Sequence, residues 1–125
     1  MGERNPIGWV DLTVSDAGSV KDFYEAVAGW TSAPLDMGGY DDYVMMAGDG
    51  ATPAGGICHA RGGNAGIPPQ WLIYITVPDL AAAVAEAEQR GGAVVVGPKK
   101  AGNGHFAVLT DPAGAVFALY QEVAA

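Results

Sequence analysis

The chain has 125 residues, a formal net charge of −8, one cysteine and 19 glycines, and half of its residues are hydrophobic. This length supports one core, so we expect residues 1–125 to form a single domain. The excess of acids argues against a nucleic-acid partner, because affinity for a phosphate backbone comes from Lys and Arg. A cationic or neutral small molecule suits the charge better. With a lone Cys58, no apolar signal core and no apolar stretch long enough for a membrane span, the sequence predicts a cytoplasmic protein with no membrane partner.

The first half of the chain predicts a strand, a helix and three further strands. Residues 9–14 are rich in β-branched and aromatic types, which favours a strand. Asp16 follows as a helix N-cap, and Gly29 lies where the helix ends. The helix carries an apolar stripe with helical spacing, formed by Val20, Phe23, Tyr24 and Val27. The three strands are expected around residues 30–33, 43–47 and 54–59.

The second half predicts the same order of elements. Residues 71–77 form the strand, Asp79 is the N-cap, and Gly91 and Gly92 end the helix. The apolar stripe of this helix consists of Leu80, Val84 and Ala87. Strands are expected at residues 93–96, 106–110 and 115–120, with turn residues between them.

The two halves match each other at an offset of 63 residues. This offset aligns LTVSD, at residues 12–16, with ITVPD at residues 75–79, and Gly29 with Gly92. Few pairs are identical, but they fall at a strand end, a helix cap and a helix stop in both halves. We therefore predict two βαβββ modules, at residues 7–59 and 70–122, joined by a Gly- and Pro-rich connector at residues 60–69.

The paired modules, the pattern of Asp16, Phe23, Tyr24, Gly29 and Trp30, and the closing DPAGAVFALY at residues 111–120 resemble the vicinal oxygen chelate (VOC) superfamily. That superfamily includes glyoxalases, bleomycin-resistance proteins, extradiol dioxygenases and fosfomycin-resistance enzymes. The resemblance implies an α+β fold, an open and curved mixed β-sheet cup with the helices packed outside. It also implies a homodimer, and leaves open whether the partners exchange modules or pack side by side.

Metal-dependent members of this superfamily use four side chains of the cup as ligands. Matching the motifs puts Trp9, Gly55, Leu72 and Ala118 at those positions, and none of them can bind a metal. Among the neighbouring positions, only Asp11 offers a ligand atom. We therefore expect no metal and no cofactor.

If Trp9 and Leu72 face the cup, strand alternation indicates what else lines it. In the last strand of the first module, Pro53, Gly55 and Ile57 should face the cup. The expected ligand-binding residues are Trp9, Asp11, Thr13, Tyr74, Thr76, Ala118 and Tyr120. The aromatic rings could stack on a flat ligand, and Asp11 with two threonines would supply the polar contacts.

Each of these residues also has a purely structural explanation. Trp9, Tyr74 and Tyr120 could be core residues, and Asp11 could be held by structural hydrogen bonds or lie at an exposed edge. His105 could be an acid or base at the rim, or an exposed loop residue. Cys58 and His59 are adjacent in a strand and point to opposite faces, which argues against a nucleophile and base pair.

We therefore expect a metal-free small-molecule-binding protein, similar to bleomycin-resistance proteins, that captures an aromatic ligand and thereby confers antibiotic resistance. Acidity and aromatic walls would favour a cationic ligand. The enzyme alternative is a lyase, isomerase or dioxygenase-like activity, either metal-free with Asp11 as the base or with a non-standard metal site. A third alternative is an interaction module that acts through its dimer surface.

Overall fold

The computed structural model describes residues 5–122, which form eight strands and two α-helices. A single 3-10 turn, η1 (Gly62–Asn64), lies in the connector. The elements of the first module are β1 (Ile7–Val14), α1 (Ala17–Ala28), β2 (Thr31–Asp36), β3 (Asp41–Met46) and β4 (Pro53–His59). Those of the second module are β5 (Trp71–Thr76), α2 (Leu80–Gln89), β6 (Ala93–Ala101), β7 (Gly104–Thr110) and β8 (Val116–Glu122).

The chain divides into two compact units, which are described separately. One unit spans Val10–Trp71 and is called the first unit. The second unit comprises the residues up to Trp9 together with those from Leu72 onward. Each unit contains one helix, and β1 begins in the second unit and ends in the first.

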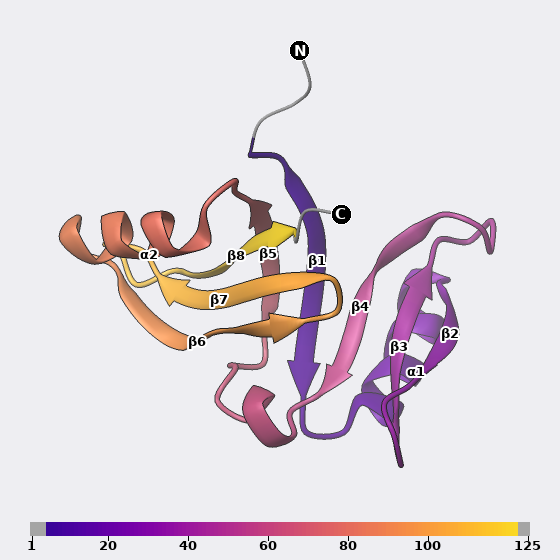
Figure 1. Ribbon diagram of the computed structural model, residues 1–125. Coiled ribbons are helices and arrows are strands. Elements are labelled where there is room, and N and C mark those ends of the chain that lie inside the picture. Colours follow the sequence, from indigo (N-terminus) through magenta and orange to yellow (C-terminus); the bar gives the residue numbers. More distant parts are fainter. Residues whose placement is uncertain (1–4, 123–125) are drawn as a thin grey trace. The chain divides into compact units, whose positions relative to one another are not determined.

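The strands of the first unit follow the order β2-β3-β4-β1 (Figure 1). β1 and β4 are parallel, whereas β3 is antiparallel to both β2 and β4. Helix α1 covers one face of these strands, and the core beneath it consists of Leu12, Ala17, Met45 and Ile57. These four side chains are at most 5% exposed, so the unit has a dry apolar core.

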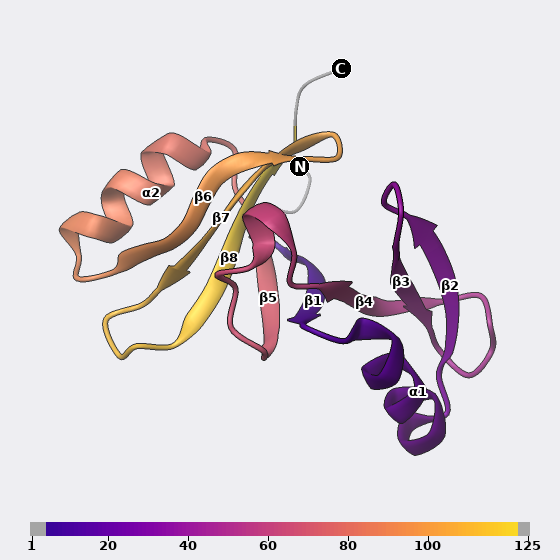
Figure 2. The same ribbon diagram turned by 90° about the horizontal axis from the view of Figure 1, so that it is seen from below.

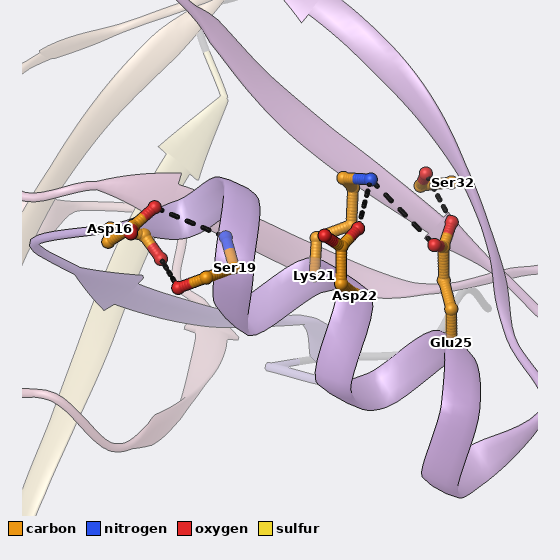
Figure 3. Close-up of polar contacts among 6 residues, drawn as sticks. All are labelled: Asp16, Ser19, Lys21, Asp22, Glu25 and Ser32. Carbon is orange, nitrogen blue, oxygen red and sulfur yellow. Dashed lines mark hydrogen bonds and ion pairs between the residues drawn. The ribbon is translucent and has the colours of Figure 1, made fainter.

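Helix α1 begins and ends as the sequence predicts. Asp16 caps it by accepting the backbone N–H of Ser19 at 3.1 Å, and Gly29 ends it in the left-handed conformation, at φ 73°. Farther along, Ser32 Oγ of β2 donates to Glu25 Oε2 at 2.7 Å, which ties the strand to the helix (Figure 3). The cap therefore satisfies the first turn of α1, and the side-chain bond links the C-terminal half of the helix to β2.

The predicted apolar stripe of α1 is only partly correct. Val20 and Tyr24 pack against the core, but Phe23 is 55% and Val27 67% exposed. Tyr24 belongs to an aromatic cluster: its ring stacks on Trp30 at 5.6 Å, and its hydroxyl accepts the indole N–H of Trp71 at 2.9 Å. The apolar stripe is wider than the surface of the strands beneath it, so Phe23 and Val27 at its edge remain exposed to solvent.

The strands of the second unit follow the order β5-β8-β7-β6, with β5 and β8 parallel. The start of β1 adjoins β5, where the N–H of Thr76 donates to the carbonyl of Pro6 at 2.9 Å. Helix α2 runs along β6 and β7 (Figure 2), and Leu80 and Val84 pack with Ala107, Leu109 and Leu119. Asp79 caps α2 through the N–H of Ala82, as predicted.

The predicted fold class is confirmed: the chain consists of two βαβββ modules with a mixed, open sheet. β2 in the first unit and β6 in the second pair with a neighbour on one side only. All eight strands occur where the sequence predicts them, although β6 continues to Ala101, beyond the predicted end at Val96. In the described residues no helix is long and apolar enough to cross a membrane.

Candidate functional site

The two modules differ by one residue in the register of their last strands. In the second module Tyr74 of β5 lies opposite Ala118 of β8. Asp11, which occupies the position equivalent to Tyr74, lies opposite Gly56 of β4. Gly56 is therefore the structural counterpart of Ala118, one residue later than the offset of 63 places it.

This shift corrects the predicted orientation of β4. A Cβ on Gly55 would lie 2.9 Å from the carbonyl oxygen of Val10 and 3.3 Å from the ring of Trp71. Ile57 is fully buried in the core under α1. Gly55 and Ile57 thus point toward the helix and not toward the open face, because a shift of one residue moves every side chain of a strand to its other face.

The face of the first unit opposite α1 carries a group of polar residues. Asp11 and Thr13 lie there as predicted, since Leu12 and Val14 between and beyond them pack under the helix. Thr13 is opposite Cys58 of β4 and is only 3% exposed. Cys58 Sγ donates to Asp11 Oδ2 at 3.6 Å. Cys58 is not among the predicted site residues, because the sequence prediction placed the other face of β4 toward the ligand.

Asp42 of β3 is the second residue that the sequence did not indicate. It is 4% exposed, and its Oδ1 accepts the backbone N–H of His59 at 2.8 Å. The ring Nδ1 of His59 lies 3.4 Å from the same oxygen. The position of Asp42 could have been predicted only from alternation in β3. Tyr43 and Met45 are large apolar residues that face the core under α1, so Asp42 lies on the opposite face.

Cys58 is unsuited to act as a nucleophile. Burial raises the pKa of its thiol far above the ordinary value, and the negative charges of Asp11 and Asp42 add to this shift. The thiol therefore stays protonated at physiological pH and acts as a hydrogen-bond donor. This agrees with the argument that Cys58 and His59, on opposite faces of β4, do not form a nucleophile and base pair.

The remaining predicted residues lie in the second unit. Tyr74 is opposite Ala118, and Thr76 is opposite Tyr120, on the face of β5 and β8 away from α2. Ala118 is fully buried, and the ring of Tyr74 lies 6.2 Å from that of Phe106. Thr76 also borders a cavity of about 510 Å³ together with Pro6, Val77 and Gln121. Trp9 is half-buried near the start of β1.

The structural positions equivalent to the metal ligands of the VOC superfamily carry no donor atoms. The resemblance assigns Trp9, Leu72 and Ala118 to those positions, and the observed pairing puts Gly56, in place of Gly55, at the counterpart of Ala118. Within residues 5–122 no three His, Cys, Asp or Glu side chains are grouped so that they could hold a metal ion. His105 is exposed on β7. The residues present therefore do not fit a metal centre of the kind that the resemblance implies for metal-dependent members.

Comparisons with known proteins agree with this fold. A family model described as Glyoxalase/Bleomycin resistance protein/Dioxygenase superfamily matches residues 6–119. The anthracycline biosynthesis protein DnrV of Streptomyces peucetius is 33% identical over 120 residues, covering 96% of this chain and 42% of the relative. The putative glyoxylase CFP32 of Mycobacterium bovis is 35% identical over 123 residues, covering 97% of this chain and 46% of the relative.

Solved structures with low sequence identity share the fold. Methylmalonyl-CoA epimerase from Mycobacterium tuberculosis superimposes with a TM-score of 0.56 at 15% identity, covering 92% of this chain and 86% of the other. A hypothetical protein from Bacillus halodurans gives 0.60 at 14% identity, covering 98% of each. The chain spans less than half the length of the curated relatives it matches. From the family match over nearly all of its length, this chain belongs to the Glyoxalase/Bleomycin resistance protein/Dioxygenase superfamily.

Proposed function

We propose that this chain binds a planar aromatic small molecule without the help of a metal ion. The proposal is supported by the residues at the four positions that the resemblance assigns to metal ligands: Trp9, Gly56, Leu72 and Ala118 have no metal-coordinating atoms in their side chains. Aliphatic, glycyl and indole groups contact flat apolar ligands but do not coordinate a divalent cation.

The aromatic character of the ligand is supported by residues of the second unit. Tyr74 and Tyr120 lie on the same helix-free face, and both are half-buried, so each ring presents area to a ligand at low conformational cost. Two relatives above 30% identity are named for anthracycline biosynthesis, and anthracyclines are planar polycyclic compounds. The ligand class that we propose is therefore a polycyclic aromatic compound such as an anthracycline.

The acidity of the chain supports a basic group on the ligand. The chain carries a formal net charge of −8. A negative field raises the local concentration of a protonated amine over that of a neutral group. We therefore include an amine substituent in the proposed ligand.

The test is a titration with the fluorescent anthracycline doxorubicin, followed by its fluorescence and by calorimetry. We expect saturable binding with one site per chain, weakened at least fivefold in both Tyr74→Ala and Tyr120→Ala. The exposed Phe23→Ala is the matched aromatic control and should bind as the wild type does. Absence of saturable binding, or equal loss in all three variants, would contradict the proposal.

A second candidate is a metal-independent lyase or isomerase that uses Asp11 as its base. It is favoured by the relative named putative glyoxylase at 35% identity and by the placement of Asp11 beside a protonated thiol. Under this alternative, the Asp11→Asn variant would still bind the ligand but would no longer turn it over. Liquid chromatography coupled to mass spectrometry of the doxorubicin recovered after binding distinguishes the two functions: capture leaves retention time and mass unchanged, whereas an isomerase changes the retention time and a lyase also changes the mass.

We also propose that the chain forms a homodimer. The proposal is supported by the resemblance to the VOC superfamily, which implies a homodimer. Light scattering coupled to size-exclusion chromatography should give twice the chain mass of 12.7 kDa. A mass of one chain across the micromolar range would contradict this proposal.

A further inference from the structure

We propose that the amine of the ligand is bound in the cavity where β5 and β8 end, and that Glu122 is the residue that selects it. The inference deepens the proposed function and rests on it, because it assigns one part of the ligand to one part of the site. The cavity has a volume of about 510 Å³, and all of its lining residues belong to the second unit. A space of this size holds a substituent such as an amino sugar.

The cavity continues the face that carries the proposed stacking residues. Thr76, the last residue of β5, lies opposite Tyr120 of β8 and lines the cavity. Glu122 follows two residues after Tyr120 in the same strand, so both side chains point to the same face of the sheet. Glu122 also lines the cavity. A ligand whose ring contacts Tyr120 can therefore place a substituent beside Glu122.

Two local contacts shape the polar part of the cavity wall. Gln121 Oε1 accepts the backbone N–H of Leu80 at 2.7 Å, which holds this side chain against the start of α2. A Cβ on Gly8 would lie 2.9 Å from Thr76 Oγ1, so the glycine leaves room for the hydroxyl. The hydroxyl supplies an acceptor in addition to the Glu122 carboxylate. The remaining lining residues are Asn5, Pro6, Val77 and Pro78.

Charge explains why an amine is the group selected. In the described part of the chain, Glu122 is the one charged residue that lines the cavity, and no ion pair there involves it. Its neighbour on β7 is Gly104, which has no side chain. Lys99 and Lys100 lie on β6, and β7 separates that strand from β8. The carboxylate can therefore form charge-assisted hydrogen bonds with a protonated amine of the ligand.

The first test uses a probe amine and does not depend on the aromatic ligand. Cyclohexylammonium is added to the isotope-labelled protein at constant ionic strength, and the backbone amide signals are followed by NMR. We expect saturable shifts at Thr76, Val77 and Gln121, and binding about threefold weaker for cyclohexanol, a neutral molecule of the same shape. Equal binding of both probes, or no saturable shift at these residues, would overturn the inference.

The second test measures selectivity for the complete ligand. The affinity for doxorubicin, whose amino sugar is positively charged, is divided by the affinity for its neutral N-acetyl derivative. We expect Glu122→Gln to lower this ratio about threefold to fivefold, which is the range for a carboxylate that lies partly in solvent. Glu88→Gln is the matched control, because it removes the same charge from an exposed position of α2 and should leave the ratio unchanged.

The outcomes separate the two proposals. Absence of doxorubicin binding would contradict the proposed function, whereas the probe amine would still decide whether the cavity selects an amine. Saturable doxorubicin binding with the same ratio in the wild type and in Glu122→Gln would overturn the inference alone. An equal fall in Glu122→Gln and Glu88→Gln would show that only the net charge acts, which also overturns it. Circular dichroism and thermal unfolding of both variants establish that they are folded.

Discussion

Two neighbouring glycines of β4 have different roles. Gly55 lies against the backbone of Val10 and the ring of Trp71, where a Cβ has no room. Gly56 lies opposite Asp11 and is the counterpart of Ala118. The first glycine is required by packing, and the second leaves a site position without a side chain. A shift of β4 by one residue would exchange the surroundings of these two glycines, so a substitution at either position tests the register of the strand.

We predict that Gly55→Ala destabilises the protein by about 2 kcal/mol, because its methyl group would overlap the Val10 carbonyl and the Trp71 ring. Gly48→Ala is the control, since its Cβ would be 3.7 Å from the nearest atom, the Gly29 carbonyl oxygen, which is ordinary contact. Urea unfolding should show a change of about 0.5 kcal/mol or less for the control. Equal stability of the two variants would mean that Gly55 faces open space.

The hydrogen bond between Trp71 and Tyr24 lies at the centre of the aromatic cluster. The indole N–H donates to the tyrosine hydroxyl at 2.9 Å, between a strand and the helix that covers it. Tyr24→Phe should cost about 1 kcal/mol of unfolding free energy, because it leaves the partly buried indole donor of Trp71 without its partner. Phe23→Leu, at the exposed neighbouring position, should cost much less, and urea unfolding of both variants compares them.

Residue orientations were predictable where they depended on alternation within one strand. The polar face of Asp11 and Thr13 followed from Leu12 and Val14, which are apolar. Asp42 and Cys58 were not predictable in this way, because the match between the modules is too weak to reveal a shift of one residue in β3 and β4. Register depends on how a strand pairs in three dimensions: β3 and β4 keep the offset of 63 relative to each other, since Tyr43 pairs with Ile57 as Phe106 pairs with Tyr120, and the shift lies between β4 and β1.

At the scale of elements, α1 shows how local signals and packing contribute separately. Its limits were predictable, because the Asp16 cap and the Gly29 stop are local interactions. Its buried face was predicted too wide, since Phe23 and Val27 are exposed. The strands beneath the helix determine which part of an apolar stripe is covered, and that width is a tertiary property.

The cap makes the stability of α1 dependent on pH. Hydrogen bonds from Ser19 lower the pKa of Asp16 below its ordinary value of 3.8. The stabilisation is therefore present above the ordinary pKa and is lost as the pH falls through the lowered value in the folded state. We predict that the wild type loses more stability than Asp16→Asn between pH 6 and pH 3, because asparagine caps without titrating. Urea unfolding of both proteins at pH 6 and pH 3 measures the two losses. Equal losses of unfolding free energy would contradict the prediction.

At the scale of the whole molecule, the order of the elements could be predicted from the sequence. The repeat of strand, helix and three strands in both halves fixed the fold class before any contact was known. The two compact units do not follow the repeat boundaries, because β1 begins in one unit and ends in the other. Such a division depends on which strands pair, and a sequence repeat does not encode it.

The net charge of −8 leads to a prediction for binding. Affinity for the cationic doxorubicin should fall as the salt concentration rises from 20 to 500 mM, whereas affinity for its N-acetyl derivative should change little. The reason is that salt screens the field of the protein but not the stacking of aromatic rings. Fluorescence titrations across this range measure both dependences. Parallel salt dependences for the two ligands would show that the acidic charge does not contribute to recognition.

The central claim is that this member of the superfamily binds an aromatic ligand without a metal ion. The direct measurement is calorimetry with doxorubicin on the purified protein before and after extensive dialysis against a chelator, with the metal content of both samples measured by mass spectrometry. We predict less than one tenth of a metal ion per chain in each sample and the same dissociation constant in both. A stoichiometric divalent metal whose removal abolishes binding, and whose return restores it, would contradict the account.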